Sequence, residues 1–183
     1  MERILKIDGK TNIRIKATAG VLIRYKQQFG REYMDDLLEV SNIEDIESES
    51  NQLKIATIGY NLLWAMAKTA DNSIPPPEEF LNIFDRDIMK IMPFVEVAEE
   101  LFKKSMDGIR DFKNSGKSDT PIRTEHLIAL SSMSGFNTQD IDNLSISMLF
   151  NSIGEYWEMK TGGTDENGVR EATQADIDAF FGR

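Results

Sequence analysis

The chain has 183 residues, of which 40% are apolar and 28% charged, a composition that is typical of globular proteins and excludes disorder throughout. It contains no cysteine, which excludes a disulfide framework, a zinc-thiolate site and a thiol nucleophile and favours a reducing cytoplasm. The formal net charge of −10 argues against DNA or RNA as a ligand, because nucleic-acid affinity depends on basic side chains that neutralise phosphates, so we expect protein partners.

The first 16 residues predict a β-hairpin. Isoleucines alternate with charged residues in segments 3–7 and 12–16, which flank a turn at residues 8–10. Because a two-stranded hairpin is marginal alone, we expect its apolar face to pack on the helices that follow. The N-terminus lacks the unbroken apolar stretch of a signal peptide, and no segment has the roughly 20 apolar residues of a membrane span, so we expect neither export nor membrane insertion.

Apolar residues then recur at helical spacing. They predict a helix from about Thr18 to Phe29, a break at Gly30 and a second helix that begins near Tyr33. Residues 41–51 are acidic and rich in serine, and we interpret them as a solvated loop or the fraying end of a helix.

The helix predicted for residues 51–70 has apolar side chains on two faces. This pattern indicates either a central helix that is buried on both faces or a helix that offers one face to a partner.

Prolines at positions 75–77 end that helix and begin the next one. Pro77 followed by two glutamates is typical of a first helical turn. The apolar spacing predicts a helix that runs through Ile88 to Pro93, which either kinks it or begins a new helix, and the apolar stripe continues to about Phe112.

Residues 113–121 are small, polar and free of apolar periodicity, which favours a linker. We therefore expect an N-terminal unit at 1–112, a linker at 113–123 and a smaller helical unit at 124–183. The predicted fold class is mainly α, a helical bundle with a small N-terminal β-hairpin followed by this C-terminal unit.

In the C-terminal unit, the periodicity predicts a helix at 124–133, a turn at 134–137 and a longer helix at about 138–160. A glycine-rich loop follows. A capping-box spacing that begins at Thr173 then predicts a last short helix that ends at Phe180 and Phe181.

Motifs that would indicate catalysis or cofactor binding are incomplete. His126 is the only histidine, so a Ser-His-Asp triad or a histidine-rich metal site would depend on one residue of a predicted amphipathic helix. Residues 116–118 lack the glycine that a phosphate-binding loop needs five residues before the Gly-Lys pair, where Asp111 stands. Residues 165–168 match a calcium loop only in part. We expect no enzymatic activity, no cofactor and no metal.

The outline of residues 124–158, two helices joined by a turn, is also that of a DNA-binding helix-turn-helix. Its second helix would present Asp140, Asp142 and Glu155 and no basic residue before Lys160, so contact with phosphates would be repulsive. A DNA-binding regulator is therefore the least favoured function.

Residues 15–31 resemble the opening segment of the tail assembly chaperones of long-tailed, siphovirus-type bacteriophages. They contain the Arg-Tyr-Lys and Phe-Gly-Arg patterns of that family. A helix like residues 53–70, a proline break and a long acidic helix follow in the family's order, and residues 148–157 resemble its C-terminal extension.

The resemblance implies a non-catalytic chaperone of the host cytoplasm that binds the tape measure protein, keeps it soluble while tail tube subunits polymerise, and is absent from the mature virion. The family has a short form and a longer, frameshifted form whose extension is thought to recruit tube subunits. This chain resembles the long form, with 124–183 as the segment for the tail tube protein. Self-association stays open, and so does a role as another phage or prophage structural or adaptor protein.

Aromatic anchors dominate protein interfaces, and apolar stripes on residues 53–67 and 88–106 could hold an apolar helix of the client in a groove. Acidic surfaces would keep such a complex soluble. Each aromatic residue could also belong to the core. We expect the client-binding residues to be Tyr25, Phe29, Tyr60, Trp64, Phe94 and Phe102.

Overall fold

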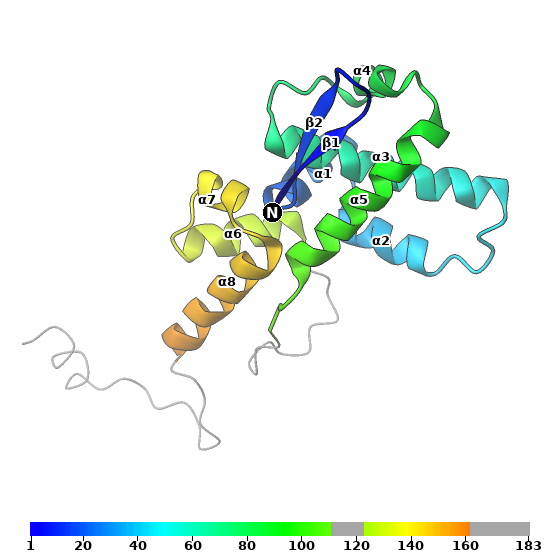
Figure 1. Ribbon diagram of the computed structural model, residues 1–183. Coiled ribbons are helices and arrows are strands. Elements are labelled where there is room, and N and C mark those ends of the chain that lie inside the picture. Colours follow the sequence, from blue (N-terminus) through cyan, green and yellow to red (C-terminus); the bar gives the residue numbers. More distant parts are fainter. Residues whose placement is uncertain (111–122, 162–183) are drawn as a thin grey trace, which may run out of the picture.

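The computed structural model describes residues 1–110 and 123–161, and these form a mainly helical protein with one N-terminal β-hairpin (Figure 1). The predicted fold class is confirmed. The elements are β1 (Glu2–Lys6), β2 (Asn12–Lys16), α1 (Gly20–Phe29), α2 (Tyr33–Ser41), α3 (Glu49–Ala70), α4 (Pro77–Phe80), the 3-10 helix η1 (Leu81–Phe84), α5 (Ile88–Met106), α6 (Thr124–Met133), α7 (Thr138–Asn143) and α8 (Ile146–Thr161).

The hairpin forms as predicted, and one of its faces lies on α3. β1 and β2 pair antiparallel with Leu5 opposite Ile13, and Asp8 Oδ1 in the turn accepts hydrogen bonds from two backbone N–H groups. Leu5, Ile13 and Ile15 are buried, whereas Ile4 lies on the solvent face, because successive side chains of a strand point to opposite sides. This burial supplies the support that an isolated hairpin lacks.

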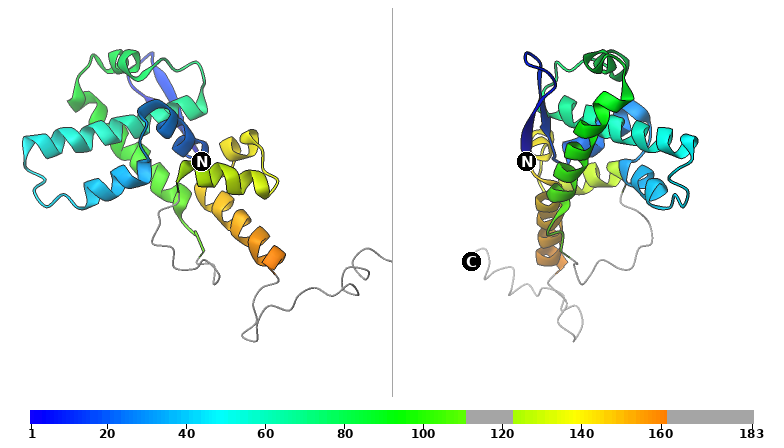
Figure 2. Two further views of the ribbon diagram at one scale, coloured as in Figure 1. Left: turned by 180° about the vertical axis from the view of Figure 1, so that it is seen from behind. Right: turned by 45° about the vertical axis from the view of Figure 1, so that its right-hand side comes forward.

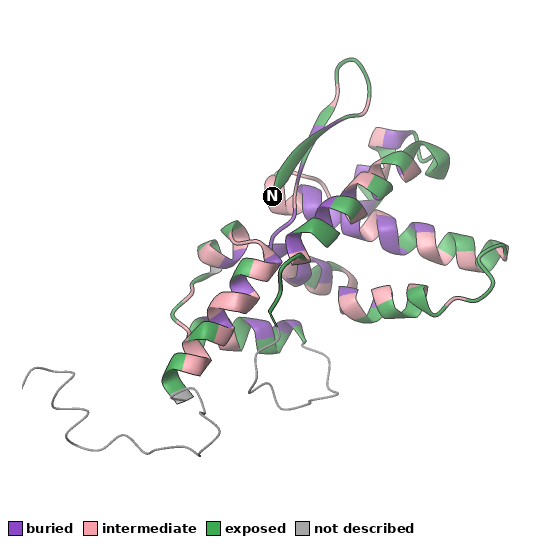
Figure 3. Cartoon of the chain, turned by 60° about the horizontal axis from the view of Figure 1, so that its bottom comes forward, coloured by how far each residue is buried: buried purple, intermediate pink, exposed green. Residues whose placement is uncertain are grey.

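Helix α3 is the centre of the fold. It contacts α1, α5 and β2, and its buried residues extend from Ala56 to Ala67 (Figure 3). The prediction of a central helix is confirmed for this stretch, whereas the first turns of α3 project beyond the core. Gly59 allows α5 to approach closely, because a Cβ at this position would lie 2.3 Å from Val95 Cγ1.

The continuous helix predicted from Pro77 to Pro93 is wrong. The chain leaves helical geometry at Asp85 and Arg86, which have φ values of 54° and 56°. Asp87 then begins α5, since its side chain accepts a hydrogen bond from the N–H of Met89 at 2.9 Å. Pro93 lies inside α5, and this helix ends at Met106, before the predicted end near Phe112.

The long helix predicted at about 138–160 is also two helices. Leu144 has an extended conformation with ψ of 140°, and its carbonyl accepts a hydrogen bond from the N–H of Ala19 at 3.3 Å. Ser145 Oγ then accepts from the N–H of Met148 at 3.2 Å, as a residue that caps the start of a helix does. The break is therefore tied to the N-terminal part of the chain.

The α6–α8 segment packs on the N-terminal part in one hydrophobic cluster, to which α6 contributes Leu127, α7 Ile141 and α8 Leu149. Arg24 holds Asp142 through two hydrogen bonds of 2.5 and 3.0 Å. The views in Figure 2 show this segment at one end of the molecule and the beginning of α3 at the other. The division into two units stays a prediction, since residues 113–122 of the linker lie outside the described residues, as do residues 162–183 with the last short helix.

The close approach of α3 and α5 gives a first prediction. Gly59→Ala places a methyl group against Val95, and we expect the overpacking to lower the free energy of unfolding by about 1–3 kcal/mol, despite the better helix propensity of alanine. Urea denaturation measures this change. Gly59→Ala combined with Val95→Ala should be more stable than the sum of the single effects, because the clash is relieved. Additive effects would contradict the proposed contact.

Candidate protein-binding site

Four of the six aromatic residues expected to bind a client meet in one row of rings across α1, α2, α3 and α5. We call this the first aromatic row, and it consists of Trp64, Phe29, Tyr25, Tyr33 and Phe102. Neighbouring centroids are 4.8 to 5.6 Å apart, which is the range of favourable edge contacts. Tyr25, Trp64 and Phe102 are buried, and Phe29 is half-buried.

The other two expected residues belong to a second row, which begins on α3 at Tyr60, one turn before Trp64. This second aromatic row runs from Tyr60 through Phe80 and Phe84 to Phe94. Both Phe80 and Phe84 are buried. Tyr60 and Phe94 are half-buried at the two ends.

The polar atoms of Tyr25, Tyr60 and Trp64 are used inside the chain. The hydroxyl of Tyr25 donates to Asp36 Oδ2 at 2.6 Å, that of Tyr60 donates to a backbone carbonyl, and Trp64 Nε1 donates to the Pro75 carbonyl at 2.8 Å. Burial, followed by the hydrogen bond to Asp36, raises the pKa of Tyr25 above its usual range. A client that contacts Tyr25 or Phe102 directly would therefore require the helices to separate.

An open apolar groove lies instead where α3 and α5 begin, beside the loop that precedes α3. It has a volume of ≈ 420 Å³, and we call it the tip groove. Ile46, Leu53 and Met89 are exposed by 62%, 64% and 75%. The lining residues are Ile46, Glu49, Gln52, Leu53, Ile55, Ala56, Ile88, Met89 and Met92.

Sequence reasoning expected apolar stripes on residues 53–67 and 88–106 to form a groove, and two walls of the tip groove lie in those ranges, but it missed the loop wall and named aromatic residues elsewhere as the contacts. Ile46 is a single apolar residue in an acidic segment, and such a segment is normally a solvated loop. Ile88 and Met89 continue an apolar stripe, so their spacing gave no sign that a break at Asp85 would leave them exposed. The signal that the sequence does contain is Leu53, which lies near the start of a helix that is apolar on two faces.

Acidic side chains surround the tip groove. The loop before α3 and its first turn carry exposed Glu44, Asp45, Glu47 and Glu49. Within residues 1–110 and 123–161, no ion pair involves any of these four. On the α5 side, Lys90 is already paired with Asp85 at 2.6 Å. The rim therefore carries uncompensated negative charge beside exposed apolar surface.

A second groove lies where α6 and α8 meet α2 and the end of α5, with a volume of ≈ 350 Å³. Its exposed residues, Ile109 and Arg123 among them, border residues 111–122, which lie outside the described part of the chain. We call it the junction groove. It is lined by Leu22, Glu32, Met34, Leu38, Met106, Ile109, Arg123, Thr124, Leu127, Ile146 and Phe150.

Glu32 ties α6 to the N-terminal helices at the junction groove. Its side chain is only 8% exposed. Its Oε2 accepts hydrogen bonds from the backbone N–H (3.3 Å) and the hydroxyl (2.6 Å) of Thr124, while Oε1 lies 3.2 Å from Lys26 Nζ. Burial alone would raise the pKa of Glu32, but the hydrogen bonds from Thr124 and Lys26 outweigh it, so this pKa lies below its usual value.

The described residues also bear on other classes of function. They contain no group of three or more His, Asp or Glu side chains that could hold a metal ion. No helix in residues 1–110 and 123–161 is long and apolar enough to cross a bilayer.

Comparisons with family models, with curated proteins and with solved structures found no match for this chain. That the protein is not an enzyme and needs no cofactor stays a prediction.

The contacts of Glu32 give a pH-dependent prediction. Because the folded-state pKa lies below the ordinary value of 4.5, the carboxylate contributes stability that is present above about pH 4.5 and is lost as the pH falls through the folded pKa. At pH 7 we expect Glu32→Gln to lower the free energy of unfolding by about 1–3 kcal/mol, and this difference should shrink below about pH 4.5.

Urea denaturation at a series of pH values measures this difference. Glu96→Gln, on the exposed side of α5, is the control and should follow the unsubstituted chain at every pH. A difference for Glu32→Gln that stays constant from neutral to strongly acidic pH would show that the ionised carboxylate contributes nothing to the docking of α6.

Proposed function

We propose that this protein is a non-catalytic tail assembly chaperone of a long-tailed bacteriophage, which binds the tape measure protein and keeps it soluble while tail tube subunits are recruited. The observation that carries the proposal is the tip groove, where Leu53 and Met89 leave apolar surface open to solvent. Exposed apolar surface bordered by polar residues is typical of a protein-binding site.

The form of the tip groove suits an apolar helical segment. Its walls come from two helices, and Met89 and Met92 on α5 are unbranched side chains that adapt to different partners. A helix binds such a groove through residues spaced three and four apart on one face. The clients of an assembly chaperone expose this kind of segment before they are assembled.

The charge of the chain supports the same function. A net charge of −10 keeps the protein, and a complex in which it covers apolar client segments, dispersed in water. The resemblance of residues 15–31 and 148–157 to tail assembly chaperones supplies the identity of the client, the tape measure protein, and the role of residues 124–183 in recruiting the tail tube protein.

The helix-turn-helix regulator is less well supported by the arrangement of α6 and α7. Helix α7 carries Asp140 and Asp142, which would repel phosphates. Asp142 is held by Arg24, and Ile141 is buried in the shared cluster, so α7 is a packing element of the fold.

Co-expression with the tape measure protein of the same phage tests the proposal. We expect the client to remain soluble and to co-elute with the full chain in size exclusion, whereas it aggregates alone. Leu53→Gln combined with Met89→Gln removes apolar surface from the tip groove and should lower the co-eluting fraction by about tenfold.

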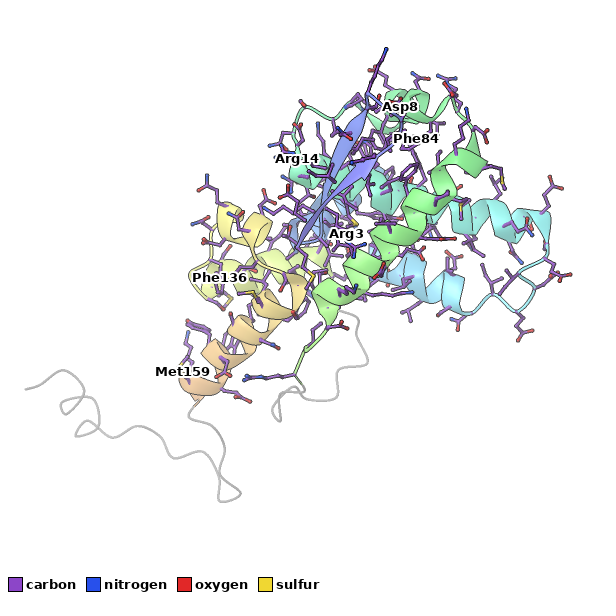
Figure 4. The ribbon with its side chains drawn as sticks, viewed as in Figure 1. Arg3, Asp8, Arg14, Phe84, Phe136 and Met159 are labelled. Atoms are coloured by element: carbon purple, nitrogen blue, oxygen red, sulfur yellow. The ribbon has the colours of Figure 1, made fainter. Side chains whose placement is uncertain are left out.

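Met159→Gln is the matched control, because Met159 is as exposed as Met89 and lies near the far end of α8 (Figure 4). It should leave the co-eluting fraction unchanged. A tape measure protein that aggregates equally with and without the chain would overturn the proposal, and the presence of the chain in purified virions would favour a structural or adaptor protein.

A further inference from the structure

We propose that the tip groove binds a basic amphipathic helix, a partner segment whose apolar stripe is flanked by lysine and arginine. The identification of that partner as a tape measure segment rests on the proposed function, but the chemistry of the segment follows from the groove itself. Two features of the groove determine this chemistry, its apolar lining and the acidic side chains of its rim.

The apolar part of the groove accepts a stripe of side chains. On α3, Leu53 and Ala56 are three residues apart and so lie on one face of the helix, and on α5 Met89 and Met92 have the same spacing. Ile46 forms a third side of the groove, from the loop. A helix with apolar residues at positions i, i+3, i+4 and i+7 presents a stripe that fits such a lining.

The rim selects the charge of the partner. Glu47 and Glu49 lie on the loop side of the groove, and Asp87 lies on the α5 side. The nearest bases leave this excess on the loop side, since Lys90 pairs with Asp85 and Lys54 with Glu39. Arg86 donates to the neutral Asn82 Oδ1 at 2.8 Å and keeps a positive charge that offsets Asp87. Lysine or arginine beside the partner's apolar stripe would neutralise this rim, and complementary charges both speed association and exclude wrong partners.

The same charge argues against two other occupants. A second copy of the chain would bring an identical acidic rim against this one. Residues 162–183 contain five acidic and two basic side chains, so this segment of the chain is itself acidic. Like charges across an interface are unfavourable, and a basic segment of another protein is the better complement.

Two synthetic helical peptides test the inference directly. Both have leucine at positions i, i+3, i+4 and i+7 and differ only at the other positions, which are lysine in one peptide and glutamate in the other. Fluorescence anisotropy of the labelled peptides with the full chain measures their affinities. We expect the lysine peptide to bind at least about tenfold more tightly than the glutamate peptide, with an affinity that falls as salt is added.

Matched variants locate the binding. Met89→Gln should weaken binding of the lysine peptide by about tenfold, and Met159→Gln should not. Glu47→Gln with Glu49→Gln should weaken it several-fold, whereas Glu78→Gln with Glu79→Gln, an exposed pair at the start of α4, removes the same charge and should leave it unchanged. Equal losses from both glutamate pairs would mean non-specific attraction to an acidic protein and would overturn the inference.

The two proposals fail separately, because neither peptide contains tape measure sequence. If the lysine peptide binds at the tip groove and the tape measure protein does not co-elute, the proposed function fails and the basic-helix site stands. If the tape measure protein co-elutes but the peptides show no preference for lysine, or Met89→Gln has no effect on them, the basic-helix site is wrong.

Discussion

The contact between α3 and α5 at Gly59 and Val95 determines how closely the two longest helices of the described residues approach. The hairpin and α1 also pack on α3, which makes α3 the element that all of them share. The tip groove depends on it as well, since α3 and α5 supply two of its walls from their first turns. A groove built on the ends of two packed helices keeps its width without a partner, which lowers the entropy that binding costs.

Most elements could be predicted from the sequence because their signals are local. The alternation of apolar and charged residues predicted the two strands of the hairpin, and Gly30, which ends α1 in a left-handed conformation, lies where the sequence predicted a helix break. The two missed breaks have other causes. Asp85 and Arg86 adopt positive φ without a glycine or proline to signal it, and the break at Leu144 is held by a hydrogen bond from Ala19, a distant residue that no local pattern contains.

The candidate site was less predictable than the fold, because a buried aromatic side chain and an interface aromatic side chain look alike in a sequence. Tyr25 and Trp64 have the residue type and spacing of either, and only the packing of α1 on α3 assigns them to the core. Ile46 was missed for the opposite reason. It is exposed and lines the tip groove, but a single isoleucine among acidic residues forms no periodic apolar pattern that would mark it as a binding residue. Exposure is a property of the whole arrangement and cannot be read from the neighbours in the chain.

The cap that Glu32 provides for α6 joins residues 92 positions apart in the sequence. A helix usually finds the acceptor for its first amides in its own N-cap residue, but Arg123 makes no such bond here. The first turn of α6 therefore has this acceptor only when the N-terminal helices are folded, so the stability of α6 is coupled to theirs.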